Sequence, residues 1–114
     1  MSARRLAALP LVLSVLGCTS THYDWGRYEE SVLVVTQRPD GFDLAAEIDA
    51  LETQAEKTAN KDHILPPGYH AHLGYLLTVA GNFGGARRHF EAEKELFPES
   101  GRFMDRLIQQ LERP

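Results

Sequence analysis

The residue best placed for chemistry in this sequence is its single cysteine, Cys18. A thiol can act as a nucleophile, ligate a metal, pair in a disulfide or accept a lipid. Cys18 follows an apolar run over residues 6–16, which itself follows Arg4 and Arg5. A short positive segment and then an apolar segment is typical of a secretory signal peptide. The run is too short to span a membrane, which needs about 20 apolar residues. An exported chain with one cysteine cannot form an internal disulfide, so we expect another use for this thiol.

The four residues 15–18, VLGC, resemble the bacterial lipobox. The resemblance implies cleavage after Gly17, a thioether-linked diacylglycerol on Cys18 and a third acyl chain on its freed amine. We therefore expect residues 1–17 to be a lipoprotein signal peptide and residues 18–24 to be the lipidated cysteine with a tether. Three acyl chains anchor a protein stably, whereas one is marginal. The alternative is a plain secretory signal with a chance cysteine, although no A-x-A cleavage site is present.

The histidines and carboxylates give little support for catalysis. His70 and His72 are two residues apart, so on a helix their side chains point about 200° apart and cannot share a metal ion. We expect one to be packed between helices and the other to be on the surface, and we expect His63 and His89 to hold no ion with them. The glutamates within residues 91–95 are expected to be a solvated face. We predict no catalytic residue, no metal and no cofactor beyond the lipid, with a small-ligand or metal-dependent enzyme as a distant alternative.

Charge and length limit the kind of partner and the number of domains. The net charge of the chain is −4, and loss of the two arginines in residues 1–17 makes it −6. An acidic surface argues against nucleic acid as a partner. Roughly 100 residues suit one small domain with a single core. We place this domain at residues 25–114.

Apolar residues recur at helical spacing through nearly all of that domain, which predicts an all-α fold of about five helices. The first is expected over about 25–37, although its VLVV run has strand propensity. Asp43 is expected to cap a second helix that ends near residue 60. A third is expected from Pro67 and a fourth up to Pro98. Ser100 is expected to cap the fifth, whose predicted buried face is Phe103, Met104, Leu107, Ile108 and Leu111.

The third and fourth helices fit the 34-residue helix–turn–helix pattern of the tetratricopeptide (TPR) repeat. Small residues at Gly74 and Ala86 would let the two helices approach closely while an aromatic ring fills the remaining space. The matching structural positions are Gly74, Gly81, Ala86, Phe90 and Pro98. A generic antiparallel helix pair is the alternative. We expect the first two helices to form a second, degenerate unit and the last helix to cap the stack.

A narrower resemblance extends over residues 23–111. The blocks DWGRYEESVL, PPGYHAHLGYLL, EKELFPES and FMDRL resemble a family of small bacterial lipoproteins named as a domain of unknown function. The resemblance implies genes encoded beside two other lipoproteins, one of them similar to the curli secretion channel, and hence an envelope complex. It implies no catalytic residue. The chain departs from the family pattern at Gly84 and Gly85, which predict a frayed start for the fourth helix.

Five aromatic residues are candidates for binding a partner, because aromatic side chains favour interfaces. They are Tyr23, Trp25, Tyr28, Tyr69 and Tyr75. The alternative for Trp25 and Tyr28 is that they fill the core of the first helix pair, and the same alternative of core or interface applies to Tyr69 and Tyr75 on the third helix. No aspartate follows Cys18, which favours the outer membrane. We therefore expect an outer-membrane lipoprotein that faces the periplasm and acts as a protein-binding scaffold with other envelope proteins, or alternatively as an adaptor of cell-wall synthases or hydrolases.

Overall fold

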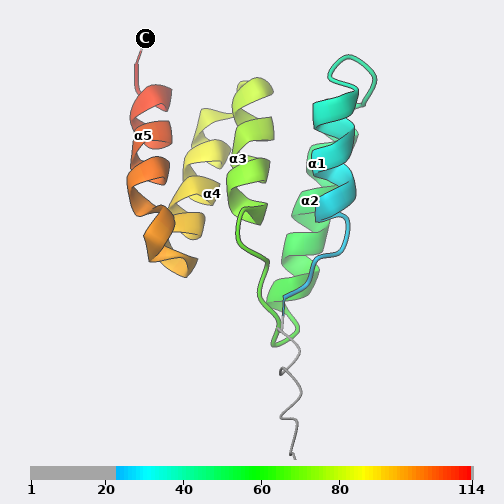
Figure 1. The fold of residues 1–114 in the computed structure, drawn as a ribbon, viewed down its shortest axis with the longest axis horizontal. Coiled ribbons are helices and arrows are strands. Elements are labelled where there is room, and N and C mark those ends of the chain that lie inside the picture. The colour runs from blue at the N-terminus through cyan, green and yellow to red at the C-terminus, as the bar shows by residue number, and fades with distance from the viewer. Residues whose placement is uncertain (1–22, 114) are drawn as a thin grey trace, which may run out of the picture.

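The structure is a computed structural model that describes residues 23–113 (Figure 1). Cys18, the predicted signal peptide and most of the predicted tether lie outside the described residues. Within 23–113 the chain forms five α-helices and a single 3-10 turn, and it contains no strand, so the predicted all-α fold is confirmed. The elements are α1 (Tyr28–Gln37), α2 (Leu44–Ala59), α3 (Tyr69–Val79), α4 (Phe83–Leu96), η1 (Pro98–Ser100) and α5 (Gly101–Leu111).

The helices stand side by side in two layers (Figure 1). Helices α1, α3 and α5 form the layer nearer the viewer, and α2 and α4 lie behind them. Helix α3 packs against both α2 and α4, and α4 packs against α5. Helices α2 to α5 therefore pack mainly on their neighbours in the chain, as in a stack of helical hairpins, whereas α1 contacts α3 through Tyr28 and Ser31. None of the helices in the described part combines the length and the apolar character needed to cross a membrane.

Local signals explain where the first two helices begin. Helix α1 begins at Tyr28, three residues later than predicted, because Gly26 has a φ of 40° and the Tyr28 N–H closes a turn onto the Trp25 carbonyl at 2.9 Å. The predicted cap of α2 is confirmed, since the Asp43 carboxylate accepts from the Ala46 N–H at 3.1 Å. Such a cap contributes about 1 kcal/mol.

The α3–α4 turn forms at Gly81, whose φ of 80° is one that a side chain would oppose. The expected fraying of α4 is wrong, because the Asn82 side chain accepts from the Gly85 N–H at 2.9 Å and caps the helix. The predicted cap of α5 is also wrong. The Ser100 hydroxyl instead donates to the Phe97 carbonyl at 2.7 Å, within the preceding turn.

The core is a single cluster that all five helices share, with α3 at its centre. Its largest fully buried side chains include Tyr69, Phe90, Leu51 and Leu73. One predicted core position is wrong, since Phe103 is 59% exposed. Within residues 23–113 no helix follows α5 to cover that side, so Phe103 remains at the surface.

Candidate functional site

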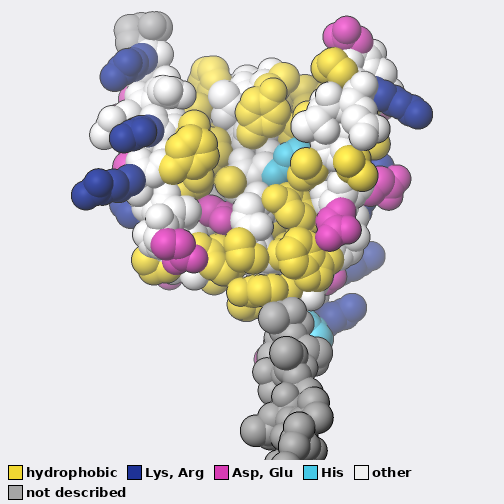
Figure 2. Space-filling model, in the orientation of Figure 1, with side chains coloured by type: hydrophobic (Ala, Val, Ile, Leu, Met, Phe, Trp, Pro, Cys, Tyr) yellow, Lys and Arg dark blue, Asp and Glu magenta, His cyan; other side chains and the backbone are white. Residues whose placement is uncertain are grey.

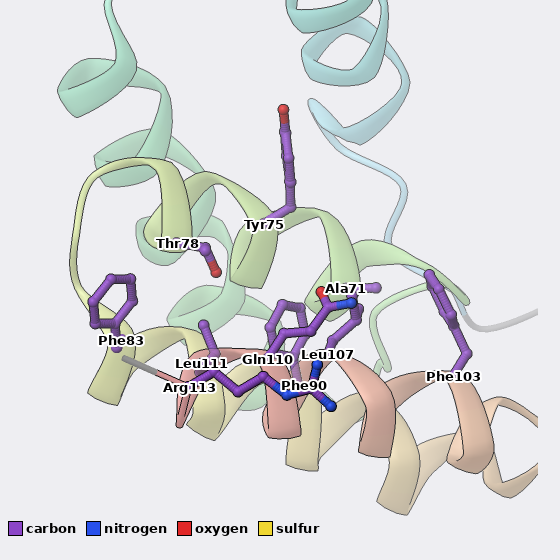
Figure 3. A pocket seen from close by; sticks show the side chains of 10 residues that line it. All are labelled: Ala71, Tyr75, Thr78, Phe83, Phe90, Phe103, Leu107, Gln110, Leu111 and Arg113. Carbon is purple, nitrogen blue, oxygen red and sulfur yellow. The ribbon is translucent and has the colours of Figure 1, made fainter.

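An apolar groove lies between α3 and α5, with α4 at its floor (Figure 3). Its volume is about 570 Å³. A hollow of this size can hold several side chains of a partner. The groove is lined by Ala71, Tyr75, Thr78, Phe83, Phe90, Phe103, Leu107, Gln110, Leu111 and Arg113.

Three aromatic side chains at the groove are half exposed. The exposed fractions are 54% for Tyr75, 53% for Phe83 and 59% for Phe103. Figure 2 shows hydrophobic side chains gathered over this face of the molecule. Isolated exposed apolar residues are normal, but several around one hollow are typical of a site that binds a protein or ligand.

The floor of the groove depends on the close approach of α3 and α4. A methyl group at Gly74 would lie 2.5 Å from Cε1 of Phe90, so only glycine leaves room for the ring. Ala86, also small, is fully buried at the same helix pair. The predicted arrangement of Gly74, Ala86 and Phe90 is therefore present, and it turns the Phe90 ring toward the base of the groove. Pro98 begins the 3-10 turn that follows α4.

The polar groups of the groove are few. The Thr78 hydroxyl donates to the Gly74 carbonyl of its own helix at 2.8 Å, while Gln110 and Arg113 line the groove from the α5 side. Neither a carboxylate nor an imidazole is among the lining residues. The Tyr75 hydroxyl is the remaining polar group, so the lining is predominantly apolar and is suited to holding apolar side chains.

The structure separates the five predicted partner-binding aromatics into different settings. Tyr75 lines the groove, whereas Trp25 is 42% exposed and is not among the residues that line it. Tyr69 is fully buried and its hydroxyl donates to the Leu51 carbonyl at 2.7 Å, and burial raises the pKa of this phenol. Tyr69 is thus a core residue that a partner cannot reach, which corrects its place among the candidates.

Tyr23, Trp25 and Tyr28 form a chain of ring contacts that ends on Tyr69. The ring centroids are 6.3 Å apart for Tyr23 and Trp25, 6.2 Å for Trp25 and Tyr28, and 5.6 Å for Tyr28 and Tyr69. Such pairs contribute about 0.5–1.5 kcal/mol each beyond their burial. The chain of rings therefore holds the segment before α1 against the helices. This packing is similar to the alternative in which Trp25 and Tyr28 fill the core of the first helix pair.

Asp24 joins this docked entry, although it belongs to the predicted tether. Its backbone N–H donates to the Ile64 carbonyl at 2.9 Å, and its carboxylate accepts from the Thr58 hydroxyl at 2.5 Å. The neighbouring Tyr23 pairs with Ile64 as an isolated β-bridge. Tyr23 and Asp24 are thus both in contact with the helical part.

A buried polar network joins α1, α2 and α3. Both Glu47 carboxylate oxygens accept from the Arg27 guanidinium, at 3.2 and 3.0 Å, and the Arg27 hydrogen bond holds the pKa of Glu47 below its usual range. The Ser31 hydroxyl and His72 Nε2 are hydrogen-bonded at 2.8 Å. A serine beside a histidine can be a nucleophile. Here Ser31 is fully buried, so no substrate reaches it, and the network serves to hold α1.

His70 and His89 form a pair that the spacing in sequence did not predict. Their Nδ1 atoms are 2.9 Å apart and their rings stack with centroids at 5.2 Å. Burial lowers the pKa of His70, and burial followed by the nearby His70 and Arg88 lowers that of His89 to about 4. The expectation that one of His70 and His72 is on the surface is wrong, since both are half-buried. Among the described residues no group of three or more potential ligands could hold a metal.

Glu93 corrects the expectation of a solvated glutamate face. It is 3% exposed, its Oε1 accepts from the Gly68 N–H at 2.7 Å, and its Oε2 is buried with no hydrogen-bond partner. An unpaired buried carboxylate oxygen is costly. The cost is partly offset because Gly68 caps the start of α3, where a negative charge is favoured by the helix dipole.

Sequence reasoning missed Phe83 and Phe103 as groove residues. A usable signal existed for Phe103, because α5 already has a continuous buried stripe in Met104 and Ile108. Phe103 lies about 100° from Met104 around the helix, so it points away from the centre of that stripe. Phe83 precedes two glycines, and no apolar pattern places it.

The fold and the groove together define a small all-α protein built of stacked helical hairpins with an exposed, aromatic-lined groove. Residues 22–107 match the model of a protein family described as a domain of unknown function, DUF4810, and the chain belongs to this family. Neither the curated proteins nor the solved structures include a match to the chain.

Proposed function

We propose that the protein is a lipid-anchored subunit of a cell-envelope complex and that it binds a partner protein in the α3–α5 groove. The observation that carries the proposal is the presence of three half-exposed aromatic side chains around one apolar hollow. Leaving such a surface in water is unfavourable, and a partner that covered it would gain about 25 cal/mol per Å² of apolar area.

The proposed location rests on the sequence that precedes the helices. The VLGC motif and the signal-like residues 1–17 support a triacylated Cys18. The residue after it is not aspartate, which supports the outer membrane and a domain that faces the periplasm. Anchoring to one surface raises the effective concentration of partners anchored to the same surface, so a shallow groove can suffice.

We further propose that the α3–α4 hairpin is a TPR-like unit, with α5 as its cap. The packing of Gly74 and Ala86 at the helix crossing, with Phe90 beside them, supports this interpretation. The family resemblance points to a lipoprotein similar to the curli secretion channel as the partner. An adaptor role for cell-wall synthases or hydrolases is the competing assignment.

The test is a pull-down from detergent-solubilised membranes of the native host, with the channel-like lipoprotein detected by mass spectrometry. Three chains are compared with wild type: Cys18→Ala, the groove double variant Tyr75→Ser with Phe103→Ser, and the control Leu33→Ser. Leu33 is a matched control because it is 53% exposed on α1, which contributes nothing to the groove lining.

Recovery by wild type and Leu33→Ser, with loss in the groove variant, supports the proposal. Loss in Cys18→Ala as well supports the contribution of the anchor. Equal recovery by the groove variant contradicts the groove as the docking surface. Recovery of a cell-wall synthase or hydrolase in place of the channel-like lipoprotein would favour the adaptor role.

A further inference from the structure

A line of arginines borders the groove along α5. Arg102 and Arg106 are four residues apart, so at about 100° per residue they lie within roughly 40° of each other on one face. The groove-lining Phe103 and Leu107 follow them around the helix, each about 100° further on. Arg113 lines the groove itself. Figure 2 shows Lys and Arg side chains along the edge of the molecule formed by α5.

These arginines carry charge that the described part of the chain does not neutralise. The acidic residues of α5 and its end are engaged elsewhere, because Asp105 pairs with Lys94 and Glu112 with Arg87, each at 2.7 Å. Arg102, Arg106 and Arg113 form no ion pair within residues 23–113. Three uncompensated positive charges therefore border an apolar wall in a chain whose net charge is −4.

The lining of the groove favours an occupant that satisfies its own backbone hydrogen bonds. An extended peptide would need partners for its N–H and C=O groups, which are costly to bury unpaired. The lining offers few, since Thr78 already donates within α3 and the other polar groups there are the Tyr75 hydroxyl, Gln110 and Arg113. A helix brings its backbone already paired and presents only side chains to such a surface.

From these observations we propose that the occupant of the groove is an amphipathic α-helix of a partner protein, with apolar residues on one face and carboxylates along the edge that meets the α5 arginines. The inference rests on the proposed function and names the class of its partner. At about 1.5 Å per residue the eleven residues of α5 extend about 16 Å, so about three turns of the partner helix can lie along it.

An anionic membrane surface is the competing explanation for the arginines. A bilayer surface is broad, and it would cover Phe103 on the rim but leave the hollow above Phe90 unfilled. A helix with protruding apolar side chains fills the hollow and meets the rim charges together. Charge complementarity with a filled groove therefore favours the helix.

The test uses two fluorescein-labelled synthetic peptides of 15 residues. Both have leucine at helical positions i, i+3, i+4 and i+7. One peptide carries glutamates along one flank of the leucine face, the other carries lysines at the same positions, and all remaining positions are alanine. Binding to the full-length protein in phosphatidylcholine nanodiscs is followed by fluorescence anisotropy, with empty nanodiscs as the blank. We expect the glutamate peptide to bind roughly tenfold more tightly than the lysine peptide at low salt, with most of that preference lost in about 0.5 M salt.

The charge variant Arg102→Gln with Arg106→Gln and Arg113→Gln should lose the preference. The matched control, which replaces Arg38, Lys57 and Lys61 by glutamine, removes the same charge from exposed positions that do not line the groove and should keep it. The peptide pair and the salt titration use the wild-type chain, so they decide the matter even where a variant does not fold.

Three results would overturn the inference. Equal binding of both peptides, lost in the variant Tyr75→Ser with Phe103→Ser, would mean that the groove binds helices without selecting acidic ones, and the proposed function would stand. If neither peptide binds but the pull-down still recovers the envelope partner through the groove, an amphipathic acidic helix is excluded as the occupant and the proposed function stands. Binding to phosphatidylglycerol nanodiscs that the charge variant loses, without peptide binding, would assign the arginines to the membrane.

Discussion

The close approach of α3 and α4 gives a sharp prediction for Gly74→Ala. In a helix this substitution ordinarily stabilises by about 1 kcal/mol. Here the new methyl group would lie 2.5, 2.7 and 3.1 Å from three ring atoms of Phe90, so the ring would have to leave its packed position and shift toward the groove that it lines. Overpacking of this kind costs about 1–3 kcal/mol. We expect a net loss of about 1–2 kcal/mol in the free energy of unfolding, and a Tm lower by about 5–10 °C.

The assay is urea unfolding of the full-length protein in detergent, followed by circular dichroism. Gly84→Ala is the control, because it is also a helical glycine and a methyl group there meets only an Arg88 nitrogen at 3.9 Å. That variant should be as stable as wild type or slightly more stable. In the double variant Gly74→Ala with Phe90→Leu the clash is relieved. Its loss in the free energy of unfolding should therefore be about 1 kcal/mol smaller than the sum of the losses of the two single variants. A Gly74→Ala protein that matches Gly84→Ala in stability would refute the reasoning.

Three further predictions concern buried polar groups. Burial, and then His70, lower the pKa of His89 to about 4, so below pH 6.5 the unfolded chain binds a proton that the folded chain excludes, and the free energy of unfolding should fall by about 1 kcal/mol from pH 7 to pH 5; urea midpoints should show this slope in wild type and a smaller one in His89→Gln. Arg27→Met should cost about 2 kcal/mol and Glu47→Gln about half of that, because the Glu47 side chain is 6% exposed and the Arg27 side chain is 42% exposed; equal losses would contradict this. Glu93→Gln keeps a hydrogen-bond acceptor and removes an unpaired buried charge, so thermal unfolding should show unchanged or slightly higher stability, whereas Glu93→Ala should lose about 1 kcal/mol.

Much of the fold could be predicted because its signals are local. The apolar spacing predicted five helices, and Asp43 indicated where α2 begins, because it is a favoured N-cap residue. Gly74, which is small, and Phe90, which is aromatic, predicted the close packing of α3 on α4. Each signal depends on residues within one helix or one hairpin, where periodicity and capping act.

The rest depended on neighbours distant in the sequence. Glu47 reads as a solvated helical residue until Arg27, twenty residues earlier, is seen to pair with it. Tyr69 and Tyr75 are alike in sequence, yet one is enclosed by the core and the other faces a groove that exists only after α5 has packed. The groove itself is made by the end of the stack, where periodicity in a single helix cannot tell whether another helix covers its flank.

The packing of α3 on α4 and of α4 on α5, each pair adjacent in the chain, also sets an order in time. Local contacts form quickly, since they require the closure of only short loops, so the hairpin of α3 and α4 with α5 should assemble early. The hydrogen bond between Ser31 and His72 joins residues 41 apart, and the attachment of α1 should therefore come late and be the first to open. Amide exchange should then be fastest in α1 and slowest in α3, and the chain would reach a state with its groove complete before its first helix has docked.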